Sequence, residues 1–105
     1  MLMNVIDSKI EDGTLHLVVK TVRLDAASSR EFKKESEARF RDPVERVTVD
    51  LGSVEFIDSS GVGALLGIYK RLPRERPVVK LLHATPPVQA VIELLRLHRI
   101  FELES

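Results

Sequence analysis

The residues whose types and spacing could support chemistry are Asp58-Ser59-Ser60-Gly61, which lie between a predicted strand and a predicted helix. Aspartate and serine are favoured helix N-cap residues, and either serine could be the cap. A hydroxyl group at a helix N-terminus lies among backbone N–H groups that have no intrahelical partner, at the positive end of the helix dipole. Such a position tolerates a phosphate. Two interpretations follow, a purely structural cap or a phosphorylation switch at Ser59.

Phosphorylation at Ser59 would change binding more than folding. A phosphate adds a charge of about −1.5 to −2 and three acceptor oxygens. At this position it would lie beside Asp58 and project into any protein docked on that end of the helix. The modification would therefore oppose docking and leave the fold largely intact.

Signatures of nucleotide binding and hydrolysis are incomplete. Gly61-Val62-Gly63 lies between a strand and a helix, as in a dinucleotide-binding fingerprint, but Leu66 occupies the place of the third glycine. The next predicted strand is followed by His83 instead of the acid that binds a ribose. A serine hydrolase elbow needs a glycine two residues before the nucleophile. The residue two before Ser59 is Ile57, so the motif is absent there. A nucleotide site at Gly61 to Gly63 is the weakest candidate.

Composition indicates one globular domain over residues 1–105, because 44% of the residues are hydrophobic and 30% are charged. Lys+Arg and Asp+Glu both number 16, so no net field recruits nucleic acid or an anionic membrane. The chain has no cysteine, and its histidines (His16, His83 and His98) lack metal-ligand spacing. We therefore predict no metal and no cofactor.

The N-terminus lacks a basic stretch followed by a long apolar run, so no signal peptide is expected. No apolar run approaches about 18 residues, so no transmembrane helix is expected either. We expect a soluble cytoplasmic protein.

The elements that must position the serine form one continuous segment, residues 47–72. Val47, Val49 and Leu51 alternate with polar residues and predict a strand. Apolar residues at helical spacing then predict a helix with one buried face, namely Val62, Leu65, Leu66, Tyr69 and Leu72. A second strand over Val78 to Leu82 predicts a right-handed parallel crossover.

Two apolar runs, Met3 to Ile10 and Leu15 to Lys20, surround an Asp12-Gly13 turn and predict an antiparallel hairpin. A charged helix should follow over Ala26 to Arg41 and end at Asp42-Pro43. Its N-terminus has two candidate caps, either Ser28 with Glu31 at capping-box spacing or Asp25.

The C-terminal part predicts one more helix, with Thr85 as N-cap before Pro86-Pro87. Its buried face is predicted to consist of Val88, Val91, Ile92 and Leu95. Residues 97–103 form either a last short strand or a tail. The predicted fold class is α/β, with a mixed four- to five-stranded sheet and about three packed helices.

The helix after the serines carries a second unusual feature, because each glycine in a helix interior costs up to about 1 kcal/mol relative to alanine. At helical spacing Gly63, Gly67, Lys70 and Arg74 share a stripe beside the core face, and Ala64, Ile68 and Arg71 lie further round, opposite the core. This face either packs closely against the domain's own backbone or is a shallow docking surface for a partner protein.

The segment FIDSSGVGALLGIYKRL closely resembles the signature of bacterial anti-sigma-factor antagonists, whose fold is the STAS domain. The resemblance covers nearly the whole chain. Leu24-Asp25 lies where the family has an acidic position before its first helix, and Thr85-Pro86-Pro87-Val88 matches the start of the last long helix.

The resemblance implies a STAS-like regulator and not an enzyme, with no catalytic residues. In such proteins the unphosphorylated antagonist binds an anti-sigma factor that is also a serine kinase of the histidine-kinase-like ATPase type. The kinase would phosphorylate Ser59 and the complex would dissociate, after which a PPM-type serine phosphatase would reset the switch. The residues expected to bind the partner are Asp25, Asp58, Ser60, Gly61, Gly63, Ala64, Gly67 and Ile68.

Two positions depart from the family pattern. Val22-Arg23 replaces Gly-Glu, which puts a positive charge at the rim of the docking surface, and Arg96 replaces a glycine, so the last helix is expected to run past its usual end. The alternative function is a STAS subunit of a larger transport or stress-sensing assembly that is not phosphorylated.

Overall fold

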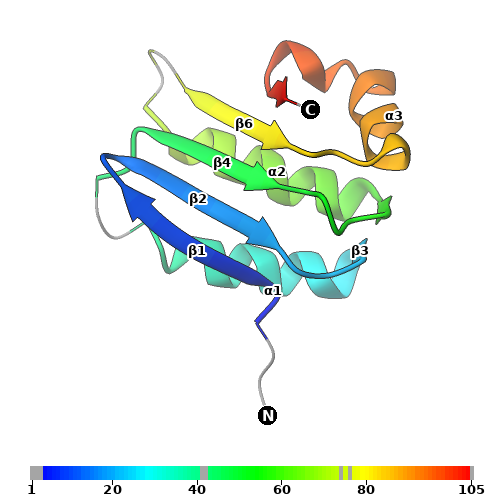
Figure 1. Ribbon diagram of the computed structural model, residues 1–105, viewed down its shortest axis with the longest axis horizontal. Coiled ribbons are helices and arrows are strands. Elements are labelled where there is room, and N and C mark those ends of the chain that lie inside the picture. Colours follow the sequence, from blue (N-terminus) through cyan, green and yellow to red (C-terminus); the bar gives the residue numbers. More distant parts are fainter. Residues whose placement is uncertain (1–3, 41–42, 74, 76, 105) are drawn as a thin grey trace.

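The structure is a computed structural model that describes residues 4–40, 43–73, 75 and 77–104. Its main element is a five-stranded sheet in the order β1-β2-β4-β6-β7, in which β1 and β2 are antiparallel and the other neighbours are parallel. Helices α1 and α2 cover one face of this sheet (Figure 1). The predicted mixed α/β fold is confirmed. The strands are β1 (Ile6–Glu11), β2 (Thr14–Val19), β4 (Arg46–Asp50), β6 (Val78–Leu82) and β7 (Glu102–Glu104), and the α-helices of the described residues are α1 (Ala26–Glu37), α2 (Ser59–Arg71) and α3 (Pro86–Leu94).

The predicted hairpin forms β1 and β2, which pair from Ile6 opposite Val19 to Glu11 opposite Thr14. Asp12 and Gly13 both have positive φ, 50° and 78°, as a type I′ turn requires. The strand was expected to begin at Met3, which lies outside the described residues.

The core lies between the sheet and the two helices. Alternate residues of the central strands, such as Leu17, Val49 and Leu81, are fully or almost fully buried, and Phe32 and Leu65 meet them from α1 and α2. The β4-α2-β6 crossover is parallel, as predicted. Within the described residues, no helix is long and apolar enough to cross a membrane.

Two very short strands were not predicted. β3 (Arg23–Leu24) and β5 (Phe56–Ile57) pair in parallel as a separate two-stranded sheet. β3 leads directly into α1, and β5 leads directly into α2. This pairing brings the N-termini of the two helices to the same end of the molecule.

The C-terminal part differs from prediction in two respects. α3 ends at Leu94, so Leu95 is 52% exposed and is not part of the buried face. Arg96 has φ of 58°, a left-handed conformation that cannot continue an α-helix, so the expected extension of the helix is wrong. A 3₁₀ turn (Leu97–Arg99) follows, and then β7 pairs with β6.

Candidate functional site

The site is built at the paired starts of α1 and α2. Asp25 and Asp58 directly follow Leu24 and Ile57, which are partners in the register of β3 and β5, and so they occupy equivalent positions. The N–H of Asp58 donates to the carbonyl of Leu24 at 3.4 Å. The short parallel sheet thus holds two helix N-termini and their carboxylates side by side.

Asp58 is the N-cap of α2. Its carboxylate accepts hydrogen bonds from the N–H of Ser60 at 2.9 Å and from the N–H of Gly61 at 3.1 Å. The prediction that either serine could be the cap is therefore wrong. Ser59 is instead the first residue of the helix, and it is exposed. Exposure of Ser59 is what the predicted switch requires.

Asp25 is the N-cap of α1, and the alternative of Ser28 with Glu31 is wrong. Asp25 and Ser28 form a reciprocal capping box, in which each side chain accepts from the other's backbone N–H at 3.3 Å and 3.0 Å. Hydrogen bonds from the backbone N–H and then from the side chain of Ser28 lower the pKa of Asp25. Desolvation opposes them, and the nearby Arg23 guanidinium adds smaller lowering effects.

Arg23, one of the two departures from the family pattern, lies beside this carboxylate. Its Nε is 3.5 Å from an oxygen of Asp25, and its guanidinium lies 3.9 Å above the centre of the Phe56 ring. The positive charge of Arg23 thus lies next to the carboxylate of Asp25.

Gly61 is buried because α2 begins in close contact with β3. A Cβ at this position would lie 2.5 Å from the carbonyl oxygen of Leu24 and 2.7 Å from Cγ1 of Ile57. Gly61 was expected to bind a partner, but it faces the interior. Its N–H already donates to Asp58, which also argues against a phosphate site at Gly61 to Gly63.

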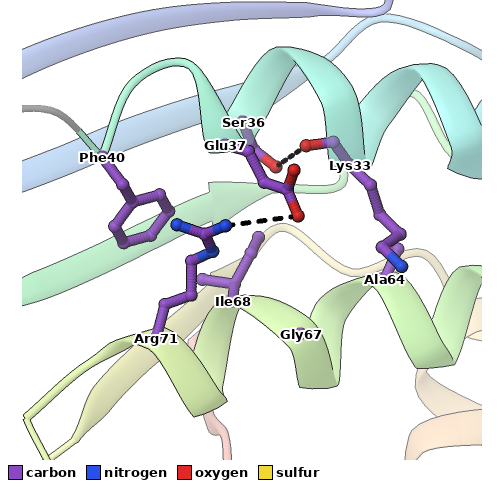
Figure 2. Close-up of a pocket in the computed structure, with 8 residues that line it drawn as sticks. All are labelled: Lys33, Ser36, Glu37, Phe40, Ala64, Gly67, Ile68 and Arg71. Carbon is purple, nitrogen blue, oxygen red and sulfur yellow. Dashed lines mark hydrogen bonds and ion pairs between the residues drawn. The ribbon is translucent and has the colours of Figure 1, made fainter.

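Gly63 and Gly67 behave differently, since a Cβ at either position would meet no atom of the described residues within 4 Å. Close packing against the domain's own backbone is therefore excluded for both. Ala64 and Ile68 were expected to lie opposite the core, and this placement is wrong, since they are 2% and 3% exposed. The reason is that α1 covers that side of α2 (Figure 2). Arg74, assigned to the glycine stripe, lies outside the described residues.

A shallow groove runs between α1 and α2. One part lies near the C-terminal ends of both helices, where Arg71 pairs with Glu37 at 3.4 Å (Figure 2). A second part lies toward the serines and shares Lys33 and Ala64 with the first. The remaining lining residues are Ser36, Phe40, Gly67 and Ile68 in the first part, and Ala26, Ser29, Arg30, Ser60 and Gly63 in the second.

Metal binding is not indicated in the part of the chain that the structure describes, where no group of three or more His, Cys, Asp or Glu side chains is arranged to hold an ion. The site therefore offers an exposed serine, two capping carboxylates and a groove with a glycine edge. These features suit recognition by a protein.

Comparison with known families decides the identity. The family model described as "Mlab, STAS domain" matches residues 6–103. The chain belongs to the STAS domain family. A curated relative, the anti-sigma F factor antagonist of Paenibacillus polymyxa, is 30% identical over 67 residues, which make up 64% of this chain and 57% of that relative. The resemblance seen in the sequence is confirmed.

Two solved structures show the same fold. The anti-sigma factor antagonist SpoIIAA in its unphosphorylated form has a TM-score of 0.77 and 24% identity, over 95% of this chain and 88% of that chain. The Bacillus cell fate determinant SpoIIAA in the phosphorylated form has a TM-score of 0.70 and 22% identity, over 95% and 91%. At these identities the likeness establishes the STAS fold.

The contact of Gly61 with Leu24 predicts opposite effects of alanine at two glycines. Gly61→Ala should destabilise the protein by about 1–3 kcal/mol, because the new Cβ overlaps backbone that cannot move freely. Gly63→Ala, the matched control on the same helix, should stabilise it by up to about 1 kcal/mol, because its Cβ enters open space. Urea unfolding measures both. Equal stability of the wild type and Gly61→Ala would contradict the close contact.

The lowered pKa of Asp25 predicts a pH-dependent contribution to stability. The ionised carboxylate stabilises the folded state above its unfolded pKa of about 3.9, and this contribution is lost as the pH falls through the lower folded pKa. Asp25→Asn keeps a capping oxygen and removes the charge. The wild type should be more stable than Asp25→Asn at pH 7, and the difference in urea unfolding free energy should shrink below about pH 3.9. A difference that is constant with pH would contradict this assignment.

Proposed function

We propose that this protein is an anti-sigma-factor antagonist that acts by partner switching. The unphosphorylated form binds an anti-sigma factor that is also a serine kinase of the histidine-kinase-like ATPase type. Phosphorylation of Ser59 releases the complex, and a PPM-type serine phosphatase restores the binding form. In this proposal the protein is a cytoplasmic regulator with no catalytic residues, no cofactor, and no nucleic-acid or membrane ligand.

The observation that carries the proposal is the exposed position of Ser59 as the first residue of α2, beside a cap that is already occupied. The N–H groups of Ser60 and Gly61 donate to Asp58. A phosphate on Ser59 would find these donors in use. Its charge of about −1.5 to −2 would therefore act outward, on whatever is docked there.

The proposed docking surface includes Ser59 and neighbouring residues of both helix starts and of the groove. Asp25 and Asp58 border it at the helix starts. Ser60, Gly63 and Gly67 extend it along the groove between α1 and α2, where the absence of side chains at both glycines permits close approach of a partner. Gly61, Ala64 and Ile68 lie beneath this surface, so their part is to set its shape.

The relatives support the proposal in two ways. A curated relative is an anti-sigma F factor antagonist. SpoIIAA, which shares the fold, is described in an unphosphorylated and a phosphorylated form. A STAS domain whose phosphorylation state changes while the fold is retained is the behaviour that we propose for this chain.

A second candidate is a STAS subunit of a larger transport or stress-sensing assembly, with no phosphorylation. The matching family model is described as Mlab, whereas the curated relative is named an anti-sigma F factor antagonist. This difference between the two descriptions supports the second candidate. A stable complex whose affinity is the same for wild type and for Ser59 variants would select it.

The first prediction from this proposal concerns the site of modification. Incubation with the cognate kinase and ATP should add one phosphate to the wild type and to Ser60→Ala, and none to Ser59→Ala. Both serines are exposed, but Ser59 is the first residue of the helix, whereas Ser60 lines the groove between α1 and α2 and its N–H donates to Asp58. Intact-mass and fragment mass spectrometry locate the phosphate. Modification of Ser59→Ala would contradict the assignment.

The second prediction concerns affinity. Ser59→Asp should keep the fold and weaken binding to the kinase at least tenfold, about 1.4 kcal/mol, because a third carboxylate joins Asp25 and Asp58 at the docking surface. Calorimetry measures the affinity, and circular dichroism verifies the fold. Ser59→Asn is the matched control of similar size without charge, and it should bind more tightly than Ser59→Asp. Equal affinities of wild type and Ser59→Asp would reject the charge mechanism.

A further inference from the structure

One edge of the five-stranded sheet is formed by β1 (Figure 1). In an antiparallel pair, consecutive residues point their N–H and C=O groups alternately toward the partner strand and away from it. A two-residue hairpin closes on a hydrogen-bonded pair, here Glu11 and Thr14. The N–H of Lys20 likewise donates to the carbonyl of Val5 at 2.7 Å. The odd-numbered residues of β1 therefore direct their backbone N–H and C=O groups toward β2. Ile6, Ser8 and Ile10 direct theirs to the outer edge of the sheet.

The sequence of this strand is self-complementary. Ile6-Asp7-Ser8-Lys9-Ile10 reads the same in both directions around Ser8, apart from the opposite charges of Asp7 and Lys9. If two copies of the strand pair antiparallel about Ser8, each Ile6 lies opposite Ile10 of the other copy. Each Asp7 then lies opposite a Lys9, and cross-strand pairs of opposite charge stabilise a sheet.

The alternation of outward and inward backbone groups along the free edge of β1 fits this register. With Ser8 opposite Ser8, the residues that direct their backbone groups outward face one another, as an antiparallel ladder requires. Glu35 of α1 accepts the N–H of Ile6 at 3.3 Å, so the ladder relies on the Ser8 pair and on the N–H of Ile10 donating to the carbonyl of Ile6.

Other registers are disfavoured. Moving the pairing by two residues places Asp7 opposite Asp7 in one direction and Lys9 opposite Lys9 in the other, and like charges directly opposite each other are unfavourable. A shift of one residue would place a residue whose backbone groups point to the outer edge opposite a residue whose backbone groups point toward β2. Charges on edge strands commonly prevent pairing. Here they oppose the shifted registers and leave the central one favourable.

We propose that β1 is an interface between two copies of this chain, which joins their five-stranded sheets edge to edge about a two-fold axis at Ser8. The interface would cover Ile10, which is 38% exposed at present. It requires only the exchange of two exposed ion pairs, Asp7 with Lys20 and Lys9 with Glu11. In Figure 1 the free edge of β1 lies away from β3 and the start of α2, so the dimer leaves the proposed switch accessible.

Charge exchange tests the register directly. Asp7→Lys and Lys9→Asp each place like charges opposite one another, and each should weaken self-association at least tenfold in sedimentation equilibrium. An equimolar mixture of the two variants should form a heterodimer, because one strand then carries two positive charges and the other two negative charges. The double variant Asp7→Lys with Lys9→Asp should again self-associate like the wild type. Glu93→Lys, on the exposed surface of α3, is the control and should have no effect.

A cross-link gives a second and independent readout. The chain has no cysteine, and residues opposite each other in a hydrogen-bonded pair have Cα atoms about 5.5 Å apart, within the range of a disulfide. Ser8→Cys should form a disulfide dimer in mild oxidant much faster than Ser53→Cys, in an exposed turn, and Asp7→Lys should slow that reaction. A wild type that stays monomeric up to about 1 mM would overturn the proposal, as would a dimer that neither charge exchange weakens.

Discussion

The candidate site depends on the close approach of the first turn of α2 to β3. Gly61 permits this approach, because any side chain there would overlap the carbonyl of Leu24. Leu24 is fully buried and pairs with Ile57, so this backbone cannot move without disturbing the core. Since β3 and β5 run parallel and each leads directly into a helix, this single contact fixes where Asp58 and Ser59 lie relative to the start of α1.

The same arrangement determines how charge acts at the site. Helix N-termini attract anions because their first N–H groups lack partners. Here each N-terminus is served by its own carboxylate, Asp25 with the N–H of Ser28, and Asp58 with the N–H of Ser60 and Gly61. Two donors that could stabilise an added phosphate, the N–H groups of Ser60 and Gly61, are thus already engaged. In the proposed switch, the charge of an anion at Ser59 would therefore act mainly on the bound partner.

Features that depend on local pattern could be predicted from the sequence. The Asp12-Gly13 turn fixes the hairpin, and the periodicity of residues 47–72 gives the crossover and places the serines at a helix start. Features that depend on contacts with distant segments of the chain could not be predicted in this way. β3 and β5 are too short to show a period and exist because they pair with each other. Ala64 and Ile68 are buried by α1, and the pattern of α2 alone contains no sign of that second contact.

The fold requires a glycine at one position of α2 and does not require one at two others. Gly61 has an internal reason, the contact with Leu24, whereas Gly63 and Gly67 face open space. Each of these two lowers helix stability by up to about 1 kcal/mol relative to alanine, and no contact among the described residues accounts for this cost. In the proposed function, the absence of a side chain at these positions allows a partner to approach α2 closely. The two positions lie one turn apart on a line that leads from Ser60 along the groove, and in the proposed function this line is where a partner would reach the helix backbone. A charge placed at Ser59 then acts at the end of that same contact.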